Sequence, residues 1–189
     1  MRTDIRHLEG LYAITDDPWN FRTSLYEADK FAATLRALPR PRYAHALELG
    51  CGNGELARRV ARRCDRYTGI DAVARPLAAA RRVVPNGRFL RRHLPCPLPS
   101  GPYDLVLLSE ILYFLDAADV EDLAYTVDAN WPDADIVVVT WCGPTGHTLQ
   151  GEDALRCFAA ATRRAPEEVV GGGMKYRIDN FDPLPRASA

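Results

Sequence analysis

A glycine-rich run, ELGCGNG at positions 48–54, constrains the fold of this chain more than any other feature. It connects a short apolar segment, 44–49, to a segment with helical periodicity, 54–64. Glycines let the backbone turn sharply and let a ligand approach without an intervening Cβ. In a doubly wound sheet, such a turn lies at the carboxyl edge of the strands, where ligands bind. The run therefore predicts a ligand-binding loop in an α/β fold.

The spacing of these glycines excludes two common nucleotide-binding loops. A dinucleotide-binding GxGxxG loop that starts at Gly50 needs a glycine at position 55, where this chain has Glu55. The GxxxxGK(S/T) loop of P-loop nucleotide hydrolases occurs nowhere in the sequence. The pattern is GxGxG with an acid, Glu48, two residues before the first glycine.

Strand-like and helix-like segments alternate along the chain. The expected strands are 44–49, 66–71, 88–90, 103–108 and 135–141. The expected helices are 54–64, a helix from the turn that contains Pro76 toward Val84, one through 120–127 capped by Asp116, and one through 155–162. This alternation predicts a doubly wound, mostly parallel sheet with right-handed crossovers.

Two segments lie outside this alternation. Residues 24–27, SLYE, form a capping box that opens a helix with apolar residues on one face. These apolar residues are Phe31, Leu35 and Leu38. Segment 167–182 reads as two strands around the glycines at 171–173, which predicts a hairpin that finishes the sheet.

The length of 189 residues fits one domain. We expect a single domain over 1–189, with an N-terminal cover (1–40), a cofactor-binding core (44–141) and a C-terminal part of the sheet (142–189). No apolar run approaches the roughly 20 residues that a membrane-spanning helix needs, and the first residues lack the apolar stretch of a secretory signal. The sequence therefore predicts a cytoplasmic protein without a membrane partner.

The cysteines and acids argue against a metal. The cysteines are odd in number and form no CxxC pair, which predicts reduced thiols rather than a disulfide framework or a structural zinc site. These are Cys51, Cys64, Cys96, Cys142 and Cys157. We interpret Cys51, inside the glycine run, as a small residue that fits a tight turn. The candidate site also lacks the clustered carboxylates that would chelate a metal, so no metal is expected.

The net charge of −1 hides an unusual basic composition, because 22 of the 24 basic residues are arginine. A basic groove for nucleic acid is therefore one hypothesis. Four arginines are expected on the solvent face of the 54–64 helix: Arg58, Arg59, Arg62 and Arg63. Four others have no evident place: Arg81, Arg82, Arg91 and Arg92. No RNA-binding motif accompanies them, so nucleic acid is not the expected partner.

Asp71, at the end of the second expected strand, is the second chemical signal. A carboxylate at that place can accept hydrogen bonds from both hydroxyls of a ribose, although a strand-end aspartate can equally be a turn residue. With these residues, the sequence resembles the class I S-adenosylmethionine-dependent methyltransferases. The resemblance rests on ELGCGNG at 48–54, TGID at 68–71 and YDLVLLSEILYFL at 103–115.

This resemblance implies a Rossmann-like methyltransferase fold, with S-adenosylmethionine as cofactor and S-adenosylhomocysteine as product. It implies that Glu48 holds the ammonium group of the cofactor and that Asp71 holds the ribose. Gly50, Gly52 and Gly54 would pass beneath the methionyl part, and Arg92, His93 and Leu94 would lie near the adenine. The other positions expected beside the cofactor are Trp19, Tyr26, Cys51, Ala72 and Ser109. The family often has an acid near the adenine, where this chain has Arg92 and His93.

A narrower resemblance is to the NodS-like methyltransferases, which N-methylate the free amine at the end of an oligosaccharide. It rests on segment 17–35, on SEILYFL at 109–115 and on GHTLQGEDAL at 146–155. It implies an amine of an amino sugar or specialised metabolite as acceptor. Fold and family do not fix the acceptor, so O-methylation of a small molecule is the second hypothesis. RNA methylation and a non-catalytic cofactor-binding protein are further alternatives, and the protein is expected to be a monomer or a homodimer.

Methyl transfer to an amine requires a neutral nitrogen, because an ammonium has no lone pair. Glu110, just beyond the fourth expected strand, is a candidate to bind the amine and accept its proton, or else a helix-start carboxylate. Tyr113 is a candidate hydroxyl donor, and His147 is either a base or a solvated loop histidine. Trp19, Tyr12 and Tyr26 would form an aromatic cover over cofactor and acceptor, or serve only in packing.

Overall fold

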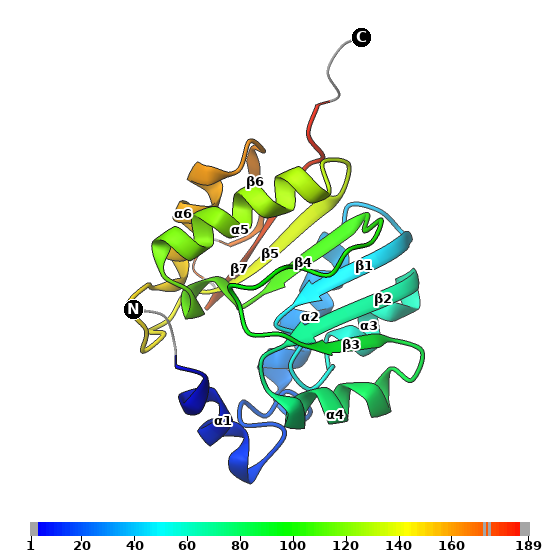
Figure 1. The fold of residues 1–189 in the computed structure, drawn as a ribbon, viewed down its shortest axis with the longest axis vertical. Helices are drawn as coiled ribbons and strands as arrows, with labels where there is room; N and C mark the ends of the chain where they lie inside the picture. The colour runs from blue at the N-terminus through cyan, green and yellow to red at the C-terminus, as the bar shows by residue number, and fades with distance from the viewer. Residues whose placement is uncertain (1–3, 172, 174, 186–189) are drawn as a thin grey trace.

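The computed structural model describes residues 4–171, 173 and 175–185. Its centre is a seven-stranded sheet with the order β3-β2-β1-β4-β5-β7-β6 (Figure 1). The strands are β1 (Tyr43–Leu49), β2 (Cys64–Asp71), β3 (Arg88–Arg91), β4 (Leu105–Ser109), β5 (Asp135–Trp141), β6 (Pro166–Val170) and β7 (Tyr176–Phe181). Strands β1 to β5 are parallel, whereas β7 is antiparallel to both β5 and β6. The expected Rossmann-like methyltransferase fold with a C-terminal hairpin is confirmed.

Helices cover both faces of the sheet. They are α1 (Ile5–Ile14), α2 (Leu25–Ala37), α3 (Ala57–Val60), α4 (Ala74–Val83), α5 (Ala117–Asn130) and α6 (Gly151–Ala161), with 3-10 turns η1 (Ala61–Arg63) and η2 (Leu112–Phe114). One apolar core joins α2, α3 and α4 to the sheet, and a second joins α5 and α6 to its other face. Alternate residues of β1 divide between them, with Ala46 in the first core and Leu47 and Leu49 in the second.

Several expected boundaries differ from those of the structure, and two of the differences have a clear local cause. The 54–64 helix begins only at Ala57, because the glycine loop occupies the preceding residues, and it tightens into η1 before Cys64 starts β2. The 103–108 strand begins only at Leu105, because the carboxylate of Asp104 accepts hydrogen bonds from the backbone N–H groups of Ala44 and His45 (2.9 and 2.8 Å) and so closes the start of the β1–β4 pair.

The capping box before α2 is half correct. The hydroxyl of Ser24 accepts a hydrogen bond from the backbone N–H of Glu27 (3.3 Å), as the sequence predicts. The carboxylate of Glu27 accepts from the ammonium group of Lys30 rather than from the backbone of Ser24, whose N–H donates to Asn20. Glu27 therefore points into the protein. The Asp116 cap of α5 is confirmed, since its carboxylate accepts from the N–H of Asp119 (3.1 Å).

The expectation that four arginines form a solvated helix face is wrong for three of them. Arg58 and Arg59 pair with the buried carboxylate of Glu55 (2.6 and 3.1 Å). The guanidinium of Arg63 donates to backbone carbonyls at the end of α2 and in the following loop. Only Arg62 is exposed. A guanidinium satisfies several acceptors at once, so these arginines fasten α2 and the glycine loop to the core.

Other arginines hold the N-terminal segment in place. Helix α1 lies on the side toward which β1, β2 and β4 point (Figure 1). Arg75 donates to the carbonyls of Ala13 and Ile14, and Arg81 donates to the carbonyl of Phe89 in β3. Two ion pairs add to these contacts, Arg82 with Asp16 (3.1 Å) and Arg91 with Glu9 (2.9 Å). Most of the arginines that had no evident place therefore hold α1, the following loop or β3.

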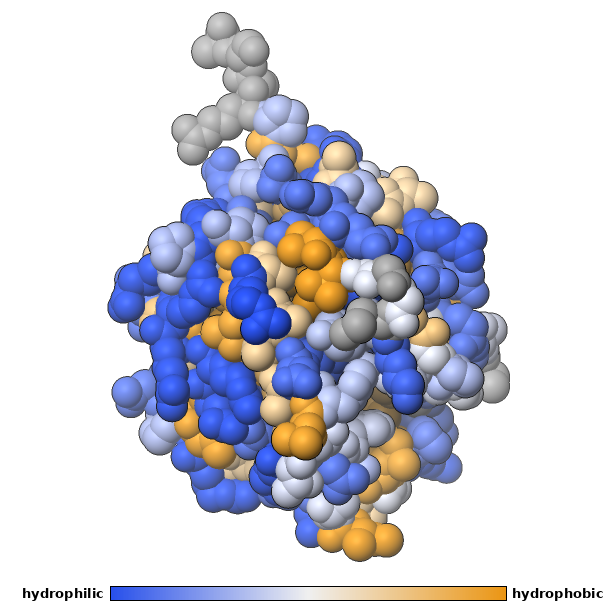
Figure 2. Space-filling view, turned by 180° about the vertical axis from the view of Figure 1, so that it is seen from behind, coloured by the Kyte–Doolittle hydropathy of each residue, from blue (hydrophilic) through white to orange (hydrophobic). Residues whose placement is uncertain are grey.

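The described surface carries separate apolar side chains. On the face shown in Figure 2, the hydrophobic spots are small and are divided by hydrophilic side chains. The large exposed apolar residues come from different segments: Leu11, Ile14, Trp19, Leu25, Val83, Tyr125 and Val169. Leu11 and Trp19 also line the cavity described below. Among the described residues, no helix combines the length and apolar character that crossing a bilayer requires.

Candidate active site

A cavity of about 600 Å³ opens at the carboxyl edge of the central strands. The glycine loop, the ends of β2 and β4, the η2 turn, the segment after β5 and helix α1 form its walls. It brings together most of the residues that the sequence singles out: Trp19, Glu48, Gly50, Cys51, Gly52, Asp71, Ala72, Arg92, His93, Leu94, Ser109, Glu110, Tyr113 and His147. Tyr26 and Gly54 are not among the lining residues.

Glu48 lies at one end of the cavity and is almost completely buried, with 1% of its surface exposed. The hydroxyl of Tyr67 donates a hydrogen bond to its carboxylate. Burial raises the pKa of Glu48 to about 7, and the Asp71 charge adds to this effect, whereas the Tyr67 hydrogen bond opposes it. Its charge is therefore costly without a cation, and a ligand that brings a cation to this end would stabilise it.

Asp71 connects the glycine loop to the end of β2 through hydrogen bonds. One carboxylate oxygen accepts from the N–H of Gly52 (3.0 Å), and the other accepts from the N–H of Val73 (2.9 Å). Burial raises the pKa of Asp71 to about 6, against the lowering effect of these hydrogen bonds. A carboxylate has about four lone-pair sites, so both oxygens can still accept from a ligand. Asp71 thus both shapes the loop and faces the cavity.

The glycines of the loop have different tasks. Gly52 has a φ of 51°, in the left-handed region, and its N–H points at Asp71. Gly54 has a φ of 84°, and a Cβ there would lie 2.8 Å from the Cα of Ala80 in α4. Gly54 therefore permits the close packing of α4 against the loop, which places it away from the cavity. Burial raises the pKa of the Cys51 thiol, which fits a packed residue rather than a reactive one.

Arg92 and His93 are exposed at the rim of this end, whereas Leu94 is buried. The backbone N–H of Arg92 donates to the carbonyl of Asp71 (2.9 Å), which continues the pairing of β2 with β3. The guanidinium of Arg92 donates to the carbonyl of its neighbour Arg91 (3.0 Å). The side chains of Arg92 and His93 therefore lie at the edge of the cavity, beside Leu94.

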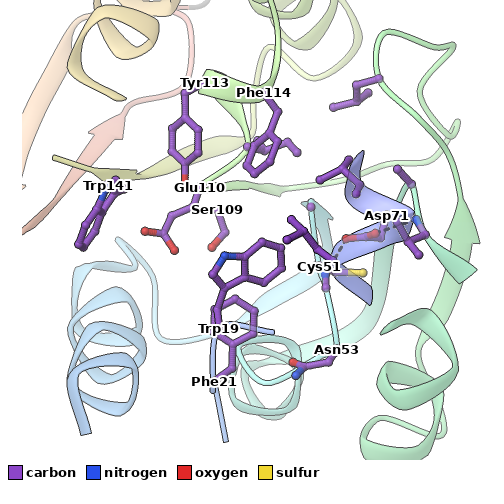
Figure 3. Close-up of a pocket in the computed structure, with 18 of the residues that line it drawn as sticks. Trp19, Phe21, Cys51, Asn53, Asp71, Ser109, Glu110, Tyr113, Phe114 and Trp141 are labelled. Carbon is purple, nitrogen blue, oxygen red and sulfur yellow. Dashed lines mark hydrogen bonds between the residues drawn. The ribbon is translucent and has the colours of Figure 1, made fainter. Parts of the chain in front are cut away.

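Glu110 lies at the other end. It follows β4 with a φ of 51°, which is unusual for a residue other than glycine, and its N–H donates to the carbonyl of Val139 (2.8 Å). Figure 3 shows Glu110, Tyr113 and Trp141 at one side of the view and Asp71 at the other, with Trp19 between them. The hydroxyl end of Tyr113 points toward Glu110 (Figure 3). Burial raises the pKa of Tyr113, and the Glu110 charge adds to this, so the hydroxyl keeps its proton and can donate it.

Two residues at this end were missed by the sequence reasoning, Lys30 and Glu27 of α2. The side chain of Lys30 is 2% exposed, and its ammonium group contacts the carboxylates of Glu27 (2.9 Å) and Glu110. A signal was present, since Glu27, Lys30, Phe31 and Thr34 share the helical spacing of one face, and all four are buried. A pair of opposite charges on an apolar helix face indicates a buried ion pair. This signal was missed because Glu27 was interpreted only as part of the capping box.

Aromatic rings form the remaining walls. His147 stacks with Tyr113 (5.9 Å between centroids) and lies 4.6 Å from Phe114. Burial lowers the pKa of His147, which favours the neutral imidazole. Across the cavity, Trp19 stacks on Phe21 (5.6 Å) and meets the edge of Tyr12 (5.4 Å). His147 is therefore partly buried among aromatic rings, and its role as a base stays a prediction.

Tyr26 packs behind this wall. Its ring meets Trp141 and Tyr176 edge-on, with centroids 6.0 and 5.8 Å apart. Trp141, rather than Tyr26, lines the cavity. Of the two roles that the sequence allows for Tyr26, a cover over the ligands or packing alone, the structure therefore favours packing. Within the described residues, no group of three or more histidines, cysteines and acids is arranged to hold a metal ion.

Comparison with known proteins places the chain in a family. The family model for Nodulation protein S (NodS) matches residues 8–131. Nodulation protein S of Sinorhizobium fredii is 26% identical over 150 residues, which are 77% of this chain and 64% of that protein. The chain spans about half to two thirds of the length of the curated relatives that it matches.

Solved structures agree with the fold. A crystal structure of a candidate methyltransferase from Pseudomonas syringae is 31% identical, with a TM-score of 0.70, over 84% of this chain and 99% of that one. The N-methyltransferase NodS from Bradyrhizobium japonicum WM9, solved with S-adenosyl-L-homocysteine, has a TM-score of 0.79 at 20% identity, over 95% of this chain and 98% of that one.

Proposed function

The chain belongs to the NodS family, and from this we propose that it transfers a methyl group from S-adenosylmethionine to an amine of a small acceptor. The observation that carries the proposal is a single cavity with two different ends. One end holds the buried Glu48 and the partly buried Asp71, and the other holds the carboxylate of Glu110 between Lys30 and the aromatic walls. A two-substrate reaction needs such a shared space.

The first end fits the cofactor. Glu48 is buried beside a second acid, so the ammonium group of S-adenosylmethionine would stabilise its charge. Asp71 presents carboxylate oxygens suited to two ribose hydroxyls, beside a glycine loop that it holds itself. The rim formed by Arg92, His93 and Leu94 is where the adenine would lie. When bound, the cofactor supplies an electrophilic methyl group on a sulfonium.

The second end fits an amine. Glu110 would bind the acceptor as an ammonium and take the proton that the nitrogen must lose before it attacks. Tyr113 would donate a hydrogen bond, and the rings of Phe114, Trp141 and His147 would exclude water. The nitrogen forms a bond to the methyl carbon while the carbon–sulfur bond breaks. Overall, the ammonium acceptor and S-adenosylmethionine become the methylated ammonium, S-adenosylhomocysteine and one proton.

A sugar amine is the acceptor class that we propose, because the NodS relative is an N-methyltransferase and the resemblance to the NodS-like methyltransferases implies the free amine of an oligosaccharide as acceptor. Flat aromatic walls suit the apolar faces of a sugar ring. A nucleic-acid acceptor gains no support from the arginines, since Arg63, Arg75 and Arg82 bind within the protein. The cytoplasmic location, the single domain and the monomeric or homodimeric state stay predictions.

The test combines binding and transfer. Titration calorimetry with S-adenosylhomocysteine measures cofactor binding, and mass spectrometry follows transfer from S-adenosylmethionine to an oligosaccharide that ends in a free amine. The matched control acceptor is the same oligosaccharide with its amine acetylated. We expect binding and methylation of the free amine only. A methyl group on a hydroxyl would replace N-methylation by O-methylation, and no binding of S-adenosylhomocysteine would refute the proposal altogether.

A further inference from the structure

The buried ion cluster Glu27–Lys30–Glu110 goes beyond the site that the sequence describes. We propose that Lys30 is a positioning residue that supplies the counter-charge of the Glu110 carboxylate and orients it toward the acceptor amine. The inference rests on the proposed function, since it concerns the same reaction. It assigns a role to a residue that does not itself line the cavity but contacts two residues that do.

The first step is the burial of Lys30. Its side chain is 2% exposed, and it is not among the residues that line the cavity. Removing an ammonium group from water costs several kcal/mol unless it is paired. Here it contacts the carboxylates of Glu27 and Glu110 and lies 5.5 Å from the ring centroid of Tyr26. Lys30 therefore reaches the acceptor only through these partners.

The second step is the conformation of Glu110. Its backbone has a φ of 51°, and its N–H is fixed to the carbonyl of Val139. A residue that is not glycine holds this conformation only where the surroundings stabilise it. Lys30 binds Oε2 of the carboxylate, which fixes the far end of the side chain. The other oxygen, Oε1, is then the one that can face the amine.

The third step is the charge of the cluster. Two carboxylates share one ammonium group, so the cluster carries one negative charge when all three groups are ionised. An acceptor ammonium would neutralise it. Burial raises the pKa of Glu27, the charges of Glu110 and Asp17 add to this effect, and Lys30 opposes it. Tyr26 and Tyr113 also face the cluster, and both keep their protons because their pKa values are raised.

Removing Lys30 would leave two neighbouring carboxylates without a cation. In such a pair one carboxyl group has a raised pKa, because like charges at close range cannot both ionise readily. Glu110 would then be a poorer binder and proton acceptor for the amine. A lysine that only fills space between α2 and the sheet would have no such effect on protonation.

The principal variant is Lys30→Met, which keeps the length of the side chain and removes its charge. We expect the affinity for S-adenosylhomocysteine to stay within twofold, kcat to fall about tenfold to a hundredfold, and the acid limb of the kcat/KM profile to move up by about one pH unit or more. The matched control is Lys175→Met, which removes the other lysine, exposed before β7, and should behave as wild type.

Two further variants separate positioning from packing. Glu27→Gln keeps Lys30 and removes one negative neighbour, so the acid limb should move down. In the double variant Lys30→Met/Glu110→Gln, kcat should equal that of Glu110→Gln alone, because both changes remove the same carboxylate function. An unchanged acid limb in the well-folded Glu27→Gln protein would overturn the proposal even if Lys30→Met does not fold.

One readout needs no turnover. In isotope-labelled protein without substrate, the side-chain carboxyl signals of Glu27 and Glu110 can be followed by NMR as the pH is changed. The titration of the pair should move to higher pH in Lys30→Met, and the same titration in both proteins would overturn the proposal. If the wild type binds S-adenosylhomocysteine but methylates no amine, the proposed function fails while this titration still decides the effect of Lys30.

Discussion

The two ends of the cavity are built in opposite ways. The cofactor end comes from one stretch of chain, in which the glycine loop and Asp71 are joined by backbone N–H donors. The acceptor end joins α2, the turn after β4 and the end of β5, with Lys30 and Glu110 brought together from 80 positions apart. The first is therefore determined by local sequence, and the second by the packing of distant segments.

The ends also differ in how their acids are balanced. Glu48 and Asp71 are stabilised by neutral donors, and burial raises their pKa values to about 7 and about 6. Glu110 has a buried ammonium group beside it. The cofactor end thus gains its cation from the ligand, whereas the acceptor end contains one. We therefore expect the affinity for the cofactor to depend on pH near neutrality. We expect turnover, which needs the acceptor end, to depend on the ion pair between Lys30 and Glu110.

The largest expected effect is a loss of turnover from a change at the acceptor end alone. Replacing Glu110 by Gln should lower kcat about 100-fold or more, since general-base catalysis contributes about 10² to 10⁴, while the Kd for S-adenosylhomocysteine stays within twofold. Steady-state kinetics and calorimetry measure the two quantities. The control is Glu121→Gln, an exposed residue of α5. Unchanged turnover in Glu110→Gln would remove this residue from the mechanism.

The next effect breaks the cofactor end alone. Asp71→Ala should weaken S-adenosylhomocysteine binding about 100-fold. The change removes hydrogen bonds to a charged group, each worth about 1.5–3 kcal/mol, and it leaves the N–H groups of Gly52 and Val73 without their acceptor. Asp71→Asn should lose less, since its side chain keeps one acceptor oxygen. Asp65→Ala, on the exposed part of β2, is the control. A wild-type Kd for Asp71→Ala would exclude the ribose role.

A third effect, smaller for each pH unit, tests the contrast in charge balance. Below its pKa of about 7, free Glu48 is protonated, and binding the cofactor ammonium must release that proton. Affinity for S-adenosylhomocysteine should therefore fall as pH falls, about tenfold per unit below pH 7, and more steeply below pH 6, where Asp71 also takes a proton. In Glu48→Gln, the step near pH 7 should disappear. Calorimetry between pH 5 and 8 measures both profiles.

Stability should change in the opposite sense to affinity. The folded pKa of Glu48 lies above its ordinary value, so its contribution to stability is present below that ordinary value and is lost as pH rises through about 7. Glu48→Gln should therefore raise the free energy of unfolding at pH 8 by up to about 3 kcal/mol, and with it Tm, and leave both nearly unchanged at pH 4. A lower Tm at pH 8 would contradict the burial cost.

The smallest effect concerns the cover that both ends share. Arg91 pairs with Glu9 of α1 at the surface, and such pairs contribute about 0–1 kcal/mol. Arg91→Gln should speed dissociation of S-adenosylhomocysteine about two- to threefold at low salt, and the difference should vanish in high salt because exposed charges are screened. Arg88→Gln, exposed on the same strand, is the control. An equal effect at both salt concentrations would rule out the ion pair as the cause.

The fold and the cofactor end were largely predictable from the sequence. Apolar periodicity locates the strands, and Glu48, Gly52 and Asp71 occupy the places that the glycine run indicates. The errors are local and have local causes. The helix after the loop is shorter than expected because its first expected residues belong to the glycine turn. Gly54 packs against Ala80 rather than lining the cavity.

The arginines and the acceptor end were not predictable in the same way. Whether Arg63 is solvated or caps carbonyls of α2 depends on which segment packs beside it. Arg62 lies in the same turn and has the same local sequence signals, but its side chain is exposed to solvent. A periodic pattern states which side of a helix is apolar, and it does not state what that side meets.

The amino-acid sequence alone is enough to predict the α/β alternation, the glycine loop and the two acids of the cofactor end, because each depends on neighbours within a few residues or on the step from one strand to the next. Only the tertiary structure decided that Lys30 lies beneath Glu110 and that His147 stacks on Tyr113. The physical reason is that a buried charge is stable only beside its counter-charge, and the chain brings these partners together only when the whole sheet and its helices are packed.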